Sequence, residues 1–152
     1  MKFKAGIFVL IIVLPLMACD QKQKTGENNP LEKIGIIKKI IEKNTPVPSN
    51  IIDVNYAEYR RGDDRLGPSD YFFFLRIEVR KEDAVKWLQG IDELPAKSKG
   101  YTDTQTNNSW WIKKSRFQQL KKYETRTYFN NTNGWMCVDK EKGYVYVYTY
   151  AM

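Results

Sequence analysis

The sequence predicts a small single-domain α+β fold, with a mainly antiparallel sheet, an N-terminal amphipathic helix and one or two further helices. The length of 152 residues suits one domain. One early segment repeats apolar residues at three- and four-residue steps, as helices do, and later segments alternate apolar and polar residues, as strands do. The expected order is a helix, two strands, a helix, a loop, a short helix and three strands, which is typical of α+β proteins.

Residues 30–43 predict the amphipathic helix. Asn29 is a favoured N-cap residue, and Pro30 fits the first helical position. The prolines within 45–48 (TPVP) end the helix. Its expected inward stripe consists of Leu31, Ile34, Ile37, Ile40 and Ile41.

Two strands follow at 51–60 and 70–80, and the turn-rich segment 61–69 between them predicts an antiparallel hairpin. In each strand, residues two apart share a face. One face of the first strand is expected to carry Ile52, Val54 and Tyr56. One face of the second is expected to carry Tyr71, Phe73, Leu75, Ile77 and Val79.

The second half of the chain predicts a helix at 81–89, an exposed polar loop at 95–109 and a brief helix at 115–122. The first of these helices is expected to turn inward Ala84, Val85 and Leu88. The second is expected to pack through Phe117 and Leu120. Three strands complete the sheet, at 123–129, 135–138 and 144–150. In the last strand, tyrosines alternate with valines, so all the tyrosines face one way.

Composition argues against an enzyme. The chain contains no histidine, which excludes catalytic triads, imidazole proton shuttles and most catalytic zinc sites. Asp63, Asp64 and Asp70 lack the alternate spacing of a calcium loop, and arginines flank the first two, so no metal site is predicted. We therefore expect a non-enzymatic protein without a cofactor.

The amino terminus has the pattern of a secretory signal peptide. Lys2 and Lys4 precede an apolar run from 5 to 16, and the chain turns polar at Asp20. As a helix, residues 5–18 would cover only about 21 Å at ~1.5 Å per residue, which is short of a hydrocarbon core of ~30 Å. The segment is thus predicted to be a targeting signal.

Leu16-Met17-Ala18-Cys19 resembles the lipobox of bacterial lipoproteins. The resemblance implies that the Cys19 thiol receives a diacylglycerol, that residues 1–18 are removed, and that the new amine is acylated. Several acyl chains give a stable membrane anchor. Asp20 resembles the signal that retains enterobacterial lipoproteins in the inner membrane. Together these features imply a cell inner membrane lipoprotein whose folded domain faces the periplasm.

The predicted organisation is therefore a signal peptide at 1–18, a lipidated cysteine with a flexible tether at 19–29, and a periplasmic domain at 30–152. Loss of Lys2 and Lys4 lowers the formal charge from +7 to +5. Cys19 would be consumed by lipid, which leaves Cys137 alone in an apolar strand. We expect Cys137 to be a small buried side chain with no intramolecular disulfide.

Aromatic residues are the candidate binding groups of the domain, namely Trp110, Trp111, Tyr146 and Tyr148. Exposed aromatics stack on sugars or bases and are enriched at protein interfaces. The alternative is that they pack a core and a sheet face. Basic residues mixed with aromatics at 113–128 resemble a nucleic-acid surface, but a periplasmic address removes that partner. The expected partners are the membrane, through the acyl chains, and an unidentified envelope protein.

Three functions follow from these features. The first is a lipid-anchored binding domain. The chain resembles prophage-borne enterobacterial inner-membrane lipoproteins of the YafY and YfjS kind in its size, in its lipobox and in the aspartate that follows Cys19. This resemblance implies a link to the envelope stress response. The second is an immunity or exclusion lipoprotein that neutralises a toxin or phage component. The third is a periplasmic cell-wall hydrolase acting through Glu78 or Asp83, although ion pairs on a sheet surface and a helix start explain both carboxylates.

Overall fold

The computed structural model describes residues 23–25, 29–62, 70–95 and 99–151. The helical segments are α1 (Pro30–Glu42), the 3₁₀ helix η1 (Lys81–Leu88), α2 (Lys114–Gln119) and α3 (Arg126–Phe129). The strands are β1 (Gln23–Thr25), β2 (Ile51–Arg61), β3 (Asp70–Val79), β4 (Gly134–Asp139) and β5 (Tyr144–Ala151). They form one sheet in the order β1-β2-β3-β5-β4, and every neighbouring pair is antiparallel. The predicted α+β class is confirmed.

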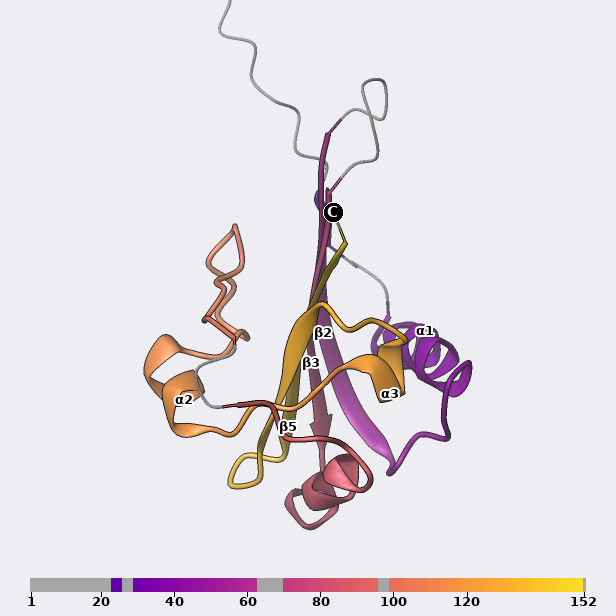
Figure 1. The fold of residues 1–152 in the computed structure, drawn as a ribbon. Helices are drawn as coiled ribbons and strands as arrows, with labels where there is room; N and C mark the ends of the chain where they lie inside the picture. The colour runs from indigo at the N-terminus through magenta and orange to yellow at the C-terminus, as the bar shows by residue number, and fades with distance from the viewer. Residues whose placement is uncertain (1–22, 26–28, 63–69, 96–98, 152) are drawn as a thin grey trace, which may run out of the picture.

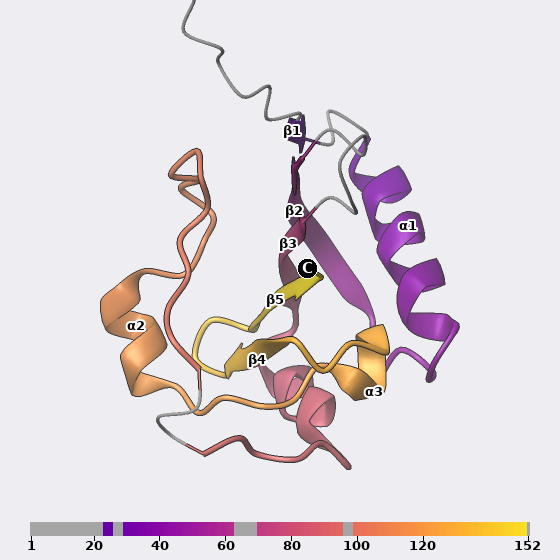
Figure 2. The ribbon, with the colours of Figure 1, turned by 45° about the horizontal axis from the view of Figure 1, so that its top comes forward.

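The sheet is the middle of three layers. Figure 1 shows it edge-on, with α1 and α3 on one side and α2 with the loop that leads into it on the other. The turned view in Figure 2 gives the same arrangement. Because both faces are covered, both faces of the central strands carry buried side chains.

Helix α1 forms as its sequence predicts. The Asn29 side chain accepts a hydrogen bond from the backbone amide of Leu31 (3.1 Å), and Pro30 occupies the first turn. Ile37 and Ile41 are completely buried against the sheet. Leu31, predicted to face inward, is instead 77% exposed because it lies in the first turn, beyond the part of the helix that packs on the strands.

Strand β2 begins with a bulge that overturns one predicted position. Ile51 pairs with Val79 and Asp53 pairs with Glu78, so Ile52 is an extra residue without a partner on β3. The bulge turns Ile51 toward the core beside Val54 and leaves Ile52 50% exposed. The alternation expected from Ile52 onward therefore holds only from Val54.

The second predicted helix is a 3₁₀ helix, and its inward face differs from the expectation. A 3₁₀ helix has three residues per turn, which places Ala84 and Trp87 on one side, and both are fully buried. Val85, predicted to face inward, is 48% exposed. Leu88 packs at the edge of the same core as a partly buried residue.

The strand predicted at 123–129 is wrong. Tyr123 forms only isolated bridges, with Glu93 and Met136, and the following residues turn into α3. The Glu124 carboxylate accepts hydrogen bonds from the backbone amides of Arg126 and Thr127, and this local bonding favours a helical turn over a strand. The other two predicted strands of this half are confirmed as β4 and β5.

Part of the predicted flexible tether belongs to the sheet. Gln23, Lys24 and Thr25 pair with Tyr59, Glu58 and Ala57 at the edge of β2. The expectation of a flexible connection over 19–29 is therefore not met at 23–25. The predicted signal peptide at 1–18, Cys19, Asp20 and most of the turn at 61–69, with Asp63 and Asp64, lie outside the described residues.

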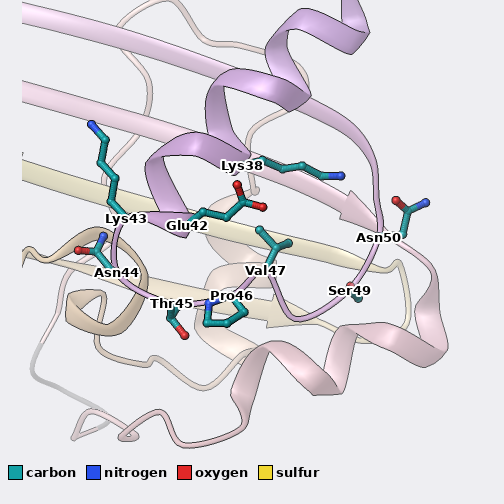
Figure 3. A pocket seen from close by; sticks show the side chains of 9 residues that line it. All are labelled: Lys38, Glu42, Lys43, Asn44, Thr45, Pro46, Val47, Ser49 and Asn50. Atoms are coloured by element: carbon teal, nitrogen blue, oxygen red, sulfur yellow. The ribbon is translucent and has the colours of Figure 1, made fainter.

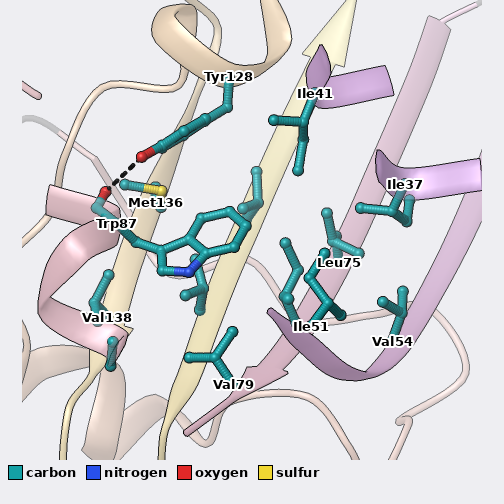
Figure 4. Close-up of a cluster of buried hydrophobic side chains, with 14 of the residues drawn as sticks. Ile37, Ile41, Ile51, Val54, Leu75, Val79, Trp87, Tyr128, Met136 and Val138 are labelled. Atoms are coloured by element: carbon teal, nitrogen blue, oxygen red, sulfur yellow. Dashed lines mark hydrogen bonds between the residues drawn. The ribbon is translucent and has the colours of Figure 1, made fainter. Parts of the chain in front are cut away.

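The core beneath α1 is mainly aliphatic, and Trp87 lies near its centre (Figure 4). The Tyr128 hydroxyl donates a hydrogen bond to the backbone oxygen of Trp87 (3.1 Å), which ties α3 to η1. Around them pack isoleucines of α1 and aliphatic side chains of the strands, including Ile37, Ile41, Ile51, Val54, Leu75, Ile77, Val79, Val145 and Val147.

Candidate binding surfaces

The predicted aromatic binding residues lie in a second core on the other face of the sheet. Tyr146 and Tyr148 are at most 8% exposed, and Trp111 is 5% exposed. The Trp111 ring lies 5.2 Å from the ring of Phe74 and 5.8 Å from that of Tyr146. Trp110 is half-buried and meets Trp111 edge-on at 5.8 Å. This burial supports the alternative interpretation, in which the aromatic row packs a sheet face.

Hydrogen bonds from aromatic residues hold the covering segment 99–112 together and join it to the sheet. Trp111 Nε1 donates to the backbone oxygen of Thr102 (2.9 Å), and the Tyr101 hydroxyl donates to that of Ile112 (3.0 Å). The Tyr59 hydroxyl bonds with the Thr106 hydroxyl (2.9 Å). The loop that the sequence predicts to be exposed is thus attached to the sheet, and Thr104 within it is buried.

An ion-paired cluster fastens α2 to the sheet, and the sequence analysis did not find it. Arg116 of α2 donates two hydrogen bonds to the fully buried carboxylate of Asp139 in β4, both at 2.8 Å. A third, at 2.7 Å, goes to the exposed Glu141. The hydrogen bonds from Arg116 lower the pKa of Asp139, so this carboxylate stays ionised as a structural partner.

Asp83, one of the two carboxylates considered for hydrolysis, lacks the environment of a general acid. Asp83 is buried and lies 2.7 Å from Lys86 Nζ and 2.8 Å from Arg80 Nε, and these hydrogen bonds lower its pKa. A glycosidase acid needs a raised pKa. Arg76, two residues before Glu78 on the same face of β3, lies 3.6 Å from Asp53. Its guanidinium also stands 4.7 Å from the centre of the Tyr144 ring.

Cys137 is the buried side chain that its position predicts. It is completely inaccessible to solvent and carries a free thiol. Burial raises its pKa to about 12, so the thiol stays protonated at neutral pH. Because the thiolate is the reactive form, Cys137 acts as a small apolar side chain of the aromatic core.

A hollow lies where α1 ends (Figure 3). Its volume is about 720 Å³. In this view Lys43 and Lys38 stand on opposite sides, with Glu42 between them. The remaining lining residues come from the connection to β2, and they are Asn44, Thr45, Pro46, Val47, Ser49 and Asn50.

Side-chain hydrogen bonds to the aliphatic core fix the floor of this hollow. Asn44 Nδ2 donates to the backbone oxygen of Tyr128 (2.9 Å), and Trp87 Nε1 donates to the Ser49 hydroxyl (2.9 Å). The connection is thus held in place before any ligand arrives. Two ammonium groups and the Glu42 carboxylate stand above amide and hydroxyl groups, so the lining carries a net charge of +1 and suits an acidic polypeptide segment. The sequence predicts only the end of the helix in this region, because the residues that line the hollow form no recognisable motif.

The described residues contain no group of three or more metal-binding side chains. Among the helices in the described part of the chain, none is long and apolar enough to cross a membrane. Comparison of the chain with models of protein families, with curated proteins and with solved structures gave no match.

Proposed function

We propose that this protein is a lipid-anchored inner-membrane lipoprotein whose periplasmic domain binds another envelope protein and has no catalytic role. The observation that carries the proposal is the Leu16-Met17-Ala18-Cys19 pattern after a short apolar run, with Asp20 following. The resemblance to YafY-like and YfjS-like lipoproteins extends the proposal to the envelope stress response.

The chemistry of the described domain supports binding over catalysis. Its two most deeply buried carboxylates, Asp83 and Asp139, are each held by cations that lower their pKa values. The hollow lined by Lys38, Lys43 and Glu42 offers a polar surface of net charge +1 instead. An acidic partner protein is the class of ligand that this surface fits.

The anchor is tested by metabolic labelling with radioactive palmitate. The wild-type chain should incorporate label, and Cys19→Ala should lose it and accumulate as the unprocessed precursor. Label that persists in Cys19→Ala would refute the anchor. The sorting signal is tested by membrane fractionation of Asp20→Ser, which should move the protein from the inner to the outer membrane. An unchanged distribution would refute inner-membrane retention through Asp20.

The partner is tested by crosslinking and pull-down from membranes with the lipidated protein. A double variant, Lys38→Glu with Lys43→Glu, should lose a partner that binds the hollow, because it replaces two attractive charges with two repulsive ones. Lys33→Glu with Lys39→Glu is the matched control, since it changes the charge of the same helix equally and neither residue lines the hollow. Equal recovery with both variants would remove the hollow from the proposal.

An immunity or exclusion lipoprotein is the second candidate, and the same charged hollow favours it, because strong one-to-one binding of an acidic toxin would use such a surface. The two candidate functions differ in whether the phenotype depends on retention of the protein in the inner membrane. Loss of all phenotype in Asp20→Ser would favour a stress component that contacts inner-membrane partners. Tight stoichiometric binding to a purified acidic protein would favour immunity.

A further inference from the structure

We propose that one end of the sheet rests on the phospholipid headgroups of the membrane, with Leu31 inserted among them. We call it the anchor end, and it consists of β1, the start of α1, the end of β2 and the start of β3. The proposal rests on the lipidation of Cys19 proposed above and adds an orientation to it. The occupant of this surface is the bilayer that holds the acyl chains.

The first step is the distance between the anchor and the folded domain. Pairing of β1 with β2 fixes Gln23 beside Tyr59. Four Cα steps separate Cys19 from Gln23, and at ~3.3–3.6 Å per residue they span at most about 14 Å. A free tether reaching to Asn29 would permit more than twice that separation. The strand pairing therefore keeps the domain close to the bilayer.

The second step is which end of the domain lies close. Tyr59 stands two residues before the end of β2, and the neighbouring Arg60 pairs with Tyr71 at the start of β3. Only four residues separate β1 from α1, and in Figure 2 the first turn of α1 is the end of that helix nearer to β1. The opposite end carries the start of β2 and η1.

The third step is the chemistry of the side chains at the anchor end. Leu31 is 77% exposed, more than either of the other large exposed apolar residues among the described residues. Arg60 and Arg61 are exposed at the end of β2. The Arg60 guanidinium lies 3.4 Å from the Glu58 carboxylate and 5.9 Å from the centre of the Tyr71 ring. An exposed apolar side chain together with arginines and a tyrosine is a combination that binds the interface of anionic bilayers.

The other two exposed apolar residues supply internal controls. Ile52 lies at the bulge that begins β2, and Val85 lies on η1, so both belong to the opposite end of the sheet. If exposure of an apolar side chain alone led to membrane contact, all three positions would behave alike. The proposed orientation separates Leu31 from the other two.

The test uses full-length lipidated protein in vesicles of phosphatidylethanolamine and phosphatidylglycerol. An environment-sensitive fluorophore is attached to Leu31→Cys, Ile52→Cys or Val85→Cys. Cys137 is buried with a protonated thiol, and Cys19 would carry lipid as a thioether, so the introduced thiol takes the label. Emission at position 31 should shift to the blue and lose intensity when the vesicles contain nitroxide-labelled lipid. Emission at positions 52 and 85 should show neither change.

The outcomes separate this proposal from the lipid anchor itself. Mass spectrometry of the same samples reports the acyl chains independently of the fluorophore. Acylated protein on vesicles with no quenching at position 31, or with equal quenching at all three positions, would overturn the orientation and leave the anchor standing. Protein without acyl chains would overturn both.

Discussion

The two faces of the sheet are packed by different means. The face beneath α1 is filled by aliphatic side chains from helices and strands, with Trp87 among them. The other face is filled by aromatic rings, and much of its cover is the loop segment before α2. A helix satisfies its own backbone groups, whereas a loop needs partners for them. Tyrosine and tryptophan fill space and also present a hydroxyl or N–H group to the covering backbone.

The comparison teaches why the second face is aromatic. Trp111 and Tyr101 belong to the covering segment, pack against the aromatic core and donate hydrogen bonds to backbone oxygens of that same segment, whereas Tyr59 of the sheet bonds with Thr106 in it. Valine or leucine in these places would fill the same space and leave those oxygens without a partner. The aliphatic face is expected to carry the global stability of the domain, and the aromatic face is expected to carry the attachment of its loop.

The largest effect is expected at Trp87 on the aliphatic face. Trp87→Ala removes a fully buried indole and its hydrogen bond to Ser49, and it should lower the free energy of unfolding by ~3–5 kcal/mol. Urea denaturation followed by circular dichroism measures this loss. A loss below 1 kcal/mol would show that the aliphatic face does not carry the global stability.

Trp111→Phe on the aromatic face is expected to have a smaller and more local effect. The ring is largely kept while the hydrogen bond to Thr102 is lost, and leaving that oxygen unpaired should cost about 1–2 kcal/mol. Hydrogen exchange should quicken in the segment 99–112 and stay slow in α1. Equal acceleration on both faces would contradict the division of roles.

Acid is expected to weaken the attachment of α2 on the aromatic face. The hydrogen bonds from Arg116 lower the pKa of Asp139 in the folded protein. At a pH between the folded and unfolded pKa values, the unfolded chain therefore binds more protons than the folded protein does. The stability from this pair is present above the unfolded carboxyl pKa of about 3.9 and is lost as the pH falls through the folded value. Near-ultraviolet circular dichroism of the aromatic core should fade below about pH 4.

Asp139→Asn is the matched control for the acid response, because it removes the titrating carboxylate and keeps the shape of the side chain. The variant should be less stable at neutral pH and should lose part of its dependence on acid. An acid profile identical to that of the wild type would assign the response to other carboxylates, of which Asp83 in η1 is the first to examine.

The smallest effect is expected at the bulge. Ile52→Thr should change the free energy of unfolding by no more than about 0.5 kcal/mol, because the side chain is half exposed and outside the regular pairing. Val54→Thr, two residues later, should cost clearly more, since Val54 is completely buried and a hydroxyl there lacks a polar environment. Equal costs at the two positions would contradict the observed register.

Alternation and helical periodicity predicted the elements whose pattern is local. The helix at 30–43, the strand at 70–80 and the tyrosine–valine alternation at 144–150 are all confirmed. The bulge at Ile52 and the 3₁₀ winding around Trp87 were not predicted, because each depends on the strand or core that the segment packs against. The strand at 123–129 failed because Glu124 bonds to backbone amides immediately after it.

The candidate surfaces were less predictable than the fold. Alternation placed Tyr146 and Tyr148 on one face, but a sequence does not show that a polar loop folds over that face. Pairing of Gln23 with Tyr59 joins residues 36 positions apart and could not be read from a polar segment. The hollow beside Lys38 likewise depends on where the connection after α1 meets the core. The lipid anchor stays a prediction from the first 20 residues.

The central claim is that acyl chains on Cys19 hold this domain against a membrane. Peptide mass spectrometry of protein purified from membranes tests it directly. The claim predicts an amino-terminal peptide that begins at Cys19, with a diacylglyceryl group on the thiol and a fatty acyl group on the amine. A chain that still begins at Met1, or a peptide with an unmodified Cys19 thiol, would contradict it.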